Sequence, residues 1–268
     1  MGGLRVDIDR AASVKPPESP IAWSVIALTC GSETDQRAAA YIAELKLRQE
    51  RGEMPRSTML LAVPDPGGHS IGSGGATANA LVVVAERISA EKQSPFIDAE
   101  LLADERVLII HLGPTKQHTT PPFTWSGKAF VNSPAPQGAE SESFTSVDAL
   151  LRQMSRLARN APHGTWVCST EAHMVPGEGV FPEDAWHKGG ITVLSVPVPL
   201  PYAKQHGTYL IGSDSQVRKL MYKASEEYLR EAGAIDTDGM VPMVCGVVFL
   251  DILAIQVHLL SFNFSLLS

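Results

Sequence analysis

The segment STMLLAVPDPGGHSIGSGGATANALVVVAERIS, residues 57–89, contains a short apolar run, a turn-rich loop and a helical stretch, in that order. Residues 57–63 have the continuous apolar character of a strand that is buried on both faces. Residues 64–75 are rich in Pro and Gly, which favour turns. From about Ala76 to Ser89 the composition predicts a helix. A strand, a loop and a helix in this order predict a parallel sheet of the α/β type.

The same alternation continues on both sides of this segment. Continuous apolar runs predict further strands at residues 23–29, 106–111, 165–169, 190–197 and 208–211. Helix-forming stretches predict helices at residues 34–51, 147–159 and 215–231. We therefore predict an open α/β sheet, mostly parallel, with helices on both faces. Ligands of such sheets bind beyond the carboxyl ends of the strands.

The chain divides by composition into three parts. Residues 1–20 are a loose lead-in, residues 21–250 form the predicted domain, and residues 251–268 form an apolar tail. The tail and the residues before it have the length of a membrane helix, but Asp251 and His258 would be costly near the bilayer centre and no basic flank follows. We therefore expect the tail to pack on the sheet or to be a sticky surface segment.

Composition narrows the class of protein and its partners. The 268 residues are 44% hydrophobic and 19% charged, which excludes a mainly disordered or fibrous chain. The formal charge of −7 and the lack of a Lys/Arg run argue against nucleic acid as a partner but leave room for a small anion. Three widely spaced cysteines and a start without an apolar signal predict a reduced, cytoplasmic protein. The oligomeric state stays open.

The glycine stretch before the predicted helix is the candidate nucleotide site. Its residues are Gly72, Ser73, Gly74, Gly75, Ala76, Thr77 and Asn79. Glycines let a ligand approach the backbone, and the start of a helix offers free N–H groups to a phosphate. The spacing is neither a P-loop, which needs a Lys, nor a good dinucleotide-binding motif, in which a glycine would replace Thr77. A phosphate cradle and a plain turn capped by Thr77 both remain open.

Six short blocks follow one another in a characteristic order over roughly residues 21–250. They are Trp23–Cys30, Leu61–Pro66, Gly72–Leu81, Trp166–Thr170, His206–Gly207 and Val241–Phe249. In this order they resemble the N-terminal region of the L-fucokinase family. The same region is similar to fucose-1-phosphate guanylyltransferases and to plant bifunctional fucokinase/GDP-fucose pyrophosphorylases. The resemblance fades after Phe249.

The resemblance implies a Rossmann-like nucleotidyltransferase domain acting in fucose salvage, in which L-fucose becomes fucose 1-phosphate and then GDP-fucose. From the resemblance, we expect the family's C-terminal β-helix and kinase domain to be absent from this chain. The implied reaction joins GTP and fucose 1-phosphate to give GDP-fucose and pyrophosphate, with Mg²⁺ as cofactor; GTP and ATP both remain open as the nucleotide. The alternative is a truncated, non-catalytic regulatory or binding fragment of a fucokinase.

The resemblance also implies roles for residues outside the glycine stretch. Gln117 and Lys128 match the family's catalytic segment, whereas His118 stands where an Arg that binds pyrophosphate is expected. Glu171 stands where the family has a metal-binding Asp, and His206 with Gly207 would face the sugar. Arg is a permanent bidentate donor and His is not, so this departure motivates the non-catalytic alternative. The other histidines, among them His111 at a strand end, lack metal-site spacing and are expected to be ordinary core or surface residues.

Overall fold

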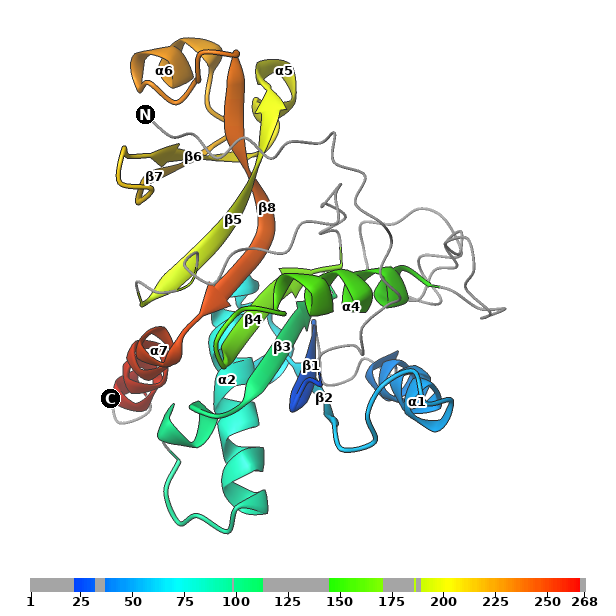
Figure 1. The fold of residues 1–268 in the computed structure, drawn as a ribbon. Helices are drawn as coiled ribbons and strands as arrows, with labels where there is room; N and C mark the ends of the chain where they lie inside the picture. The colour runs from blue at the N-terminus through cyan, green and yellow to red at the C-terminus, as the bar shows by residue number, and fades with distance from the viewer. Residues whose placement is uncertain are drawn as a thin grey trace.

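The computed structural model describes residues 22–31, 37–97, 99–112, 145–170, 186 and 189–265 (Figure 1). Within these ranges, eight strands form one sheet in which the path β2-β1-β3-β4-β8-β6-β7 is hydrogen-bonded and β5 pairs with β8. The strands are β1 Val25–Cys30, β2 Met59–Pro64, β3 Arg106–His111, β4 Gly164–Ser169, β5 Ile191–Pro199, β6 Gly207–Ile211, β7 Val217–Tyr222 and β8 Met240–Leu250. The helices are α1 Arg37–Glu50, α2 Gly72–Glu91, α4 Ser146–Leu157, α5 Leu200–Ala203, α6 Glu226–Glu231 and α7 Ile252–Ser265, with short 3-10 turns at Pro66–Gly68 and Ala99–Leu102.

The first four strands are parallel, as their apolar runs predict. β1 pairs with β2 on one side and with β3 on the other, and β4 follows β3. All six residues of β1 are buried, as are the four central residues of β3. A parallel sheet is covered on both faces, so both sides of these strands must be apolar. The predicted α/β class is confirmed by this part of the structure.

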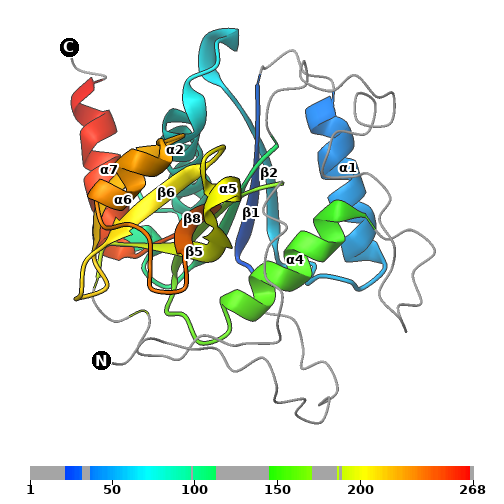
Figure 2. The same ribbon diagram turned by 90° about the horizontal axis from the view of Figure 1, so that it is seen from above.

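Helices cover both faces of the parallel strands, as predicted (Figure 2). On one face, α1 and α4 pack over the strands; α4 contributes Val147, Leu150, Met154 and Leu157, spaced to form one stripe of a helix. On the other face lie α2 and α7, with Leu81, Val84 and Ile88 of α2 buried against β1 and β3. The sheet therefore has a separate hydrophobic core on each face, between the strands and the helices that cover them.

The sheet as a whole is mixed, because every strand added beyond β4 is antiparallel to its neighbour. β8 pairs antiparallel with β4, with β5 and with β6, and β7 pairs antiparallel with β6. The predicted helix 215–231 is wrong over its first half: residues 217–222 are β7, and only Glu226–Glu231 form α6. Pairing with β6 outweighs the helix preference of the residues in this segment.

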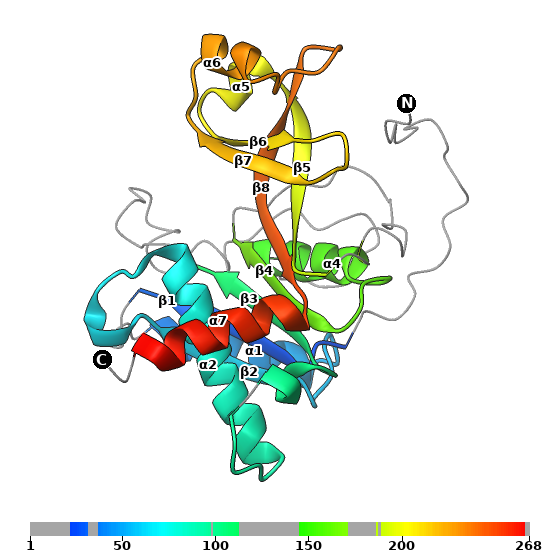
Figure 3. The same cartoon turned by 90° about the vertical axis from the view of Figure 1, so that its left-hand side faces the viewer.

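A lobe, defined here as residues 195–244, projects beyond the carboxyl end of the parallel strands (Figures 1 and 3). The second half of β8 pairs with β4, and its first half continues outward with β5. The register of this pair shifts between Val193 and Ser195, where the sheet leaves the body. The lobe has its own small core, which includes Ala203, Met221, Leu229 and Val241.

The apolar C-terminal stretch forms α7, which lies across α2 (Figure 3). Ala254, Ile255 and Leu259 are buried in the core that α2 builds on that face. Asp251 begins the helix by accepting a hydrogen bond from the Ala254 N–H at 2.9 Å and holds the Gly190 N–H at 2.6 Å. None of the helices in the described part of the chain combines the length and apolar character needed to cross a membrane.

Candidate functional site

The carboxyl ends of the four parallel strands meet at one edge of the sheet. The connections between these parallel strands run in two directions across the sheet, because β2 lies on one side of β1 and β3 lies on the other. The topological switch point is therefore between β1 and β3. Open α/β sheets bind ligands in the crevice outside such a switch point. The switch point here lies between the end of β1, with Thr29 and Cys30, and the end of β3, with His111.

The glycine stretch forms the first turn of α2, which is a correction to the sequence prediction. Instead of a loop that ends near Ala76, the helix begins at Gly72, where φ is 73° and only glycine enters without strain. Gly72, Ser73 and Gly74 are exposed, and a Cβ atom added at Gly72 or Gly74 would meet no atom within 4 Å. The turn therefore presents bare backbone, including the unpaired N–H groups of a helix start, at its surface.

Thr77 is buried inside α2 and does not cap the helix, because the N-cap position is Ile71 and has no side-chain hydrogen bond. The Thr77 Oγ1 lies 2.9 Å from Nε2 of His111. Asn79, predicted to bind nucleotide, is half-buried and donates its side-chain N–H to the Pro64 carbonyl at 3.2 Å. Two side chains of α2 thus hold the start of the helix against the ends of β2 and β3.

His111 joins three elements at the switch point. Its Nδ1 lies 2.8 Å from Thr29 Oγ1, and Thr29 is also its register partner in the β1–β3 pair. With Thr77 on Nε2, both ring nitrogens have a hydroxyl partner. Sequence reasoning gave His111 no role; the signal that was available is its position at the carboxyl end of a strand beside Thr29.

Burial controls the charge in this region. Burial lowers the pKa of the His111 imidazole below its ordinary value, and the Asp65 carboxylate opposes the shift. The imidazole is therefore mainly neutral at pH 7. Asp65 itself follows β2, is buried, and donates its backbone N–H to the Cys30 carbonyl at 2.8 Å. The ends of β2 and β3 thus carry one buried aspartate and one mainly neutral imidazole.

Four predicted site residues lie outside the described residues: Gln117, His118, Lys128 and Glu171. The described chain stops at Leu112 after β3 and at Thr170 after β4, where the Thr170 N–H donates to the His111 carbonyl at 3.1 Å. The predicted roles of the four residues stay predictions.

His206 and Gly207 belong to the lobe. His206 is exposed after α5, and Gly207 begins β6 opposite Tyr222. Across the described ranges, no hydrogen bond or ion pair joins either residue to residues 72–79. The assignment of His206 and Gly207 to the sugar stays a prediction.

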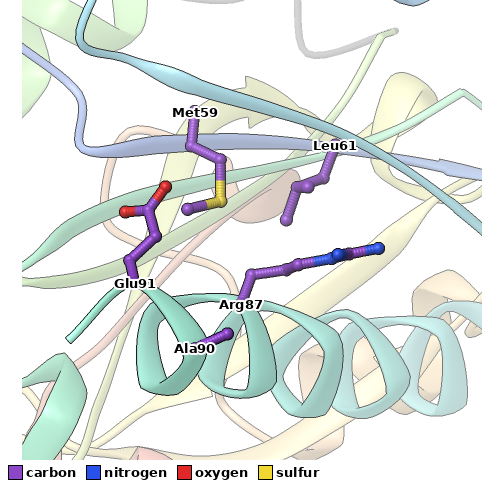
Figure 4. A pocket seen from close by; sticks show the side chains of 5 residues that line it. All are labelled: Met59, Leu61, Arg87, Ala90 and Glu91. Carbon is purple, nitrogen blue, oxygen red and sulfur yellow. The ribbon is translucent and has the colours of Figure 1, made fainter. Parts of the chain in front are cut away.

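Two open cavities lie away from the glycine turn. One, of about 370 Å³, is lined by Met59 at the amino end of β2 and by Arg87 and Glu91 near the end of α2 (Figure 4). The other, of about 280 Å³, lies in the lobe beside Ser195 and Asp236. Neither includes a residue at the carboxyl edge of the parallel strands, so strand order and the His111 contacts locate the candidate site better than cavity size. Among the residues the structure describes, no three His, Cys, Asp or Glu side chains gather to hold a metal ion.

Comparison with known proteins finds one matching domain family and several named relatives. The sequence model of one family, the fucose pyrophosphorylase domain, matches residues 99–266. The match begins after α2 and continues through α7, so the similarity extends beyond Phe249, where the resemblance was expected to fade. The chain is 27% identical to a bifunctional fucokinase/GDP-fucose pyrophosphorylase from Arabidopsis thaliana, over 88% of this chain and 24% of the relative. It is 25% identical to fucose-1-phosphate guanylyltransferases from Mus musculus, covering 81% of this chain and 34% of the relative, and from Homo sapiens, covering 78% and 32%. The chain thus spans a quarter to a third of the length of these relatives.

Proposed function

The chain belongs to the fucose pyrophosphorylase domain family, and from this premise we propose that it is a nucleotide-binding domain of fucose salvage that makes GDP-fucose from GTP and fucose 1-phosphate. The names of its relatives support this proposal, since they include a guanylyltransferase acting on fucose 1-phosphate and a GDP-fucose pyrophosphorylase. The name of the bifunctional relative also includes a kinase activity, and we assign that activity to none of the described residues.

The proposed reaction exchanges one phosphorus–oxygen bond for another. A phosphate oxygen of fucose 1-phosphate forms a bond to the α-phosphorus of GTP. The bond between that phosphorus and the oxygen bridging to the β-phosphate breaks, and its electron pair leaves with pyrophosphate. The protein's share of such a transfer is positioning and charge neutralisation.

The observation that carries the proposal is the exposed turn Gly72–Gly75, which starts a 20-residue helix at the carboxyl edge of the parallel strands. Unpaired N–H groups and the positive end of the helix dipole attract phosphate oxygens. Because a Cβ at Gly74 would lie in open space, backbone there can approach a ligand without a side chain in between. We assign the nucleotide phosphates to this turn.

The remaining roles follow the resemblance. We propose that Lys128 neutralises phosphate charge and that Gln117 and His118 contact the leaving pyrophosphate. We assign the sugar to His206 and Gly207. His118 would offer at most one N–H while neutral, so we expect a slower enzyme than a relative that has Arg in this place.

Mg²⁺ enters the proposal with the nucleotide. This ion usually keeps several waters and takes one or two carboxylates together with substrate phosphates. Following the resemblance, the proposed carboxylate is Glu171, which lies outside the described residues. When bound, the ion would neutralise phosphate charge.

The test measures binding and turnover separately. Calorimetry with GTP and with ATP gives affinity, and pyrophosphate release from GTP, fucose 1-phosphate and Mg²⁺ gives activity. Gly74→Ala places a methyl group in open space on a helix, so it should leave the unfolding midpoint unchanged or slightly raised and weaken GTP binding about tenfold or more. The control is Glu86→Ala, an exposed change farther along the same helix.

Each outcome has a distinct meaning. Binding with pyrophosphate release supports the enzyme. GTP binding without release would favour the non-catalytic nucleotide-binding fragment. Failure of both nucleotides to bind, or equal affinity of the Gly74→Ala and unsubstituted proteins, would overturn the assignment of phosphate to this turn.

A further inference from the structure

We propose that His111 is a positioning residue that fixes the first two turns of α2 at the carboxyl edge of the sheet. It acts through Thr77 and is itself held by Thr29. Its effect on nucleotide binding rests on the function proposed above, whereas its effect on the helix does not.

The first turn of α2 needs such an anchor, because its own sequence stabilises it poorly. Gly is the weakest helix former apart from Pro, and this turn contains Gly72, Gly74 and Gly75. The preceding Ile71 makes no side-chain capping bond, and the first turn contains no acidic residue. A tertiary contact just after the glycines supplies the order that the local sequence does not.

The hydrogen bonds around His111 have the geometry of an anchor. Thr29 lies 82 positions before it and Thr77 lies 34 positions before it, so one imidazole connects β1, β3 and α2. Both hydroxyl groups belong to residues less than a tenth exposed. A neutral imidazole has one donor and one acceptor nitrogen, and a hydroxyl can complement either. Both bonds therefore persist in either tautomer, and a hydrocarbon side chain could form neither.

The contact with Thr77 is what sets the helix, and conservative variants of His111 separate it from the contact with Thr29. Gln places its amide near the Nε2 position of His, which faces Thr77, whereas Asn places its amide near Nδ1, which faces Thr29. We expect His111→Gln to preserve the position of α2 and His111→Asn to release it. A role in overall stability alone would not favour Gln in this way.

Amide hydrogen exchange on the ligand-free chain tests the proposal directly. In His111→Asn and in Thr77→Val, protection of amides in residues 76–79 should fall about tenfold, while protection around Ile88 at the far end of α2 stays constant. His111→Gln should stay within about twofold of the unsubstituted protein. The matched control is Thr165→Val, which removes a buried hydroxyl that has no hydrogen-bond partner in the described structure.

GTP titration then measures the consequence for binding. His111→Asn and Thr77→Val should each raise the Kd for GTP about five- to tenfold, and the double variant should be no worse than either single one, because both remove the same bond. Equal amide protection in all variants, or a uniform loss across α2, would overturn the positioning role. If the unsubstituted chain binds no GTP, the proposed function fails, and the exchange measurement still decides the role of His111.

Discussion

Arg48 of α1 and Asp148 of α4 lie 100 positions apart in the chain and form a bidentate ion pair. Nε of Arg48 donates to Oδ1 of Asp148 at 2.6 Å, and a terminal nitrogen donates to Oδ2 at 3.0 Å. The same guanidinium reaches Thr145, which begins α4 in a capping box with Asp148. One buried arginine therefore joins the two helices on one face of the sheet and completes the start of α4.

Replacing Arg48 by Met should destabilise the fold by about 3 kcal/mol, because it leaves the Asp148 carboxylate without its cation in a mostly buried setting. Urea unfolding followed by circular dichroism measures the change. A second Arg–Asp pair at the same 2.6 Å, Arg218 with Asp214, is more than half exposed on the arginine side and provides the control. Arg218→Met should leave the urea midpoint unchanged. Equal effects of the two changes would contradict the importance given to burial.

The Asp148 pair also predicts an acid limit to stability. Burial by itself would raise the pKa of Asp148, but hydrogen bonds from Arg48 and Thr145 hold it below the ordinary value. A carboxylate with a lowered folded-state pKa contributes stability above its unfolded pKa, and this contribution is lost as pH falls through the folded value. Between about pH 5 and pH 2 the unsubstituted protein should therefore lose more unfolding free energy than Asp148→Asn. Parallel stability curves for the two proteins over this range would contradict the prediction.

The parallel half of the fold was predictable because each of its strands is a continuous apolar run. A strand that is buried on both faces has no alternation of polar and apolar residues, so its apolar composition alone predicts it. The predicted strand at residues 106–111 has the same bounds as β3. α4 was equally visible, since Val147, Leu150 and Met154 form one stripe. Strands with one exposed face, such as β7, depend on their partner strand, and no local pattern separated Val217–Tyr222 from the helix that follows.

At the glycine turn, the exposure of the backbone was predictable from the sequence, but its conformation and contacts were not. The glycines between residues 72 and 75 indicated backbone open to a ligand, and the structure confirms that they are exposed or half-exposed at the start of a helix. Their helical conformation could not be read locally, because the contacts that hold the turn come from His111 and Pro64 in other elements. The same reason concealed His111, whose two partners lie far from it in sequence.

Gly164 and Gly74 should respond in opposite ways to substitution by Ala. A Cβ at Gly164, where φ is 150°, would lie 2.6 Å from the Leu250 carbonyl oxygen and 2.8 Å from the Phe249 ring. The carbonyl belongs to β8, which pairs with β4 at Thr165, so it cannot withdraw without breaking the ladder. Gly164→Ala should cost about 3 kcal/mol of unfolding free energy. Gly74→Ala, in open space on a helix, should be neutral or slightly stabilising in the same denaturant titration, and a loss there as large as at Gly164 would refute the described geometry.

The three cysteines should resist alkylation until the protein unfolds. Cys30, Cys168 and Cys245 are 5%, 0% and 8% exposed, and none of these three described residues forms a disulfide. Burial raises the pKa of the Cys168 thiol. Burial also raises the pKa of Cys245, although backbone hydrogen bonds oppose part of the shift. Little reactive thiolate of these two residues therefore exists at pH 8. Iodoacetamide labelling followed by mass spectrometry should therefore find no modified cysteine in native protein on the time scale that labels all three in urea.

When denaturant is raised gradually, labelling of Cys168 should follow the global transition, since β4 lies in the centre of the sheet and opens only when the neighbouring strands separate. Rapid labelling of Cys168 in the absence of denaturant would mean that β4 is not enclosed by β3 and β8.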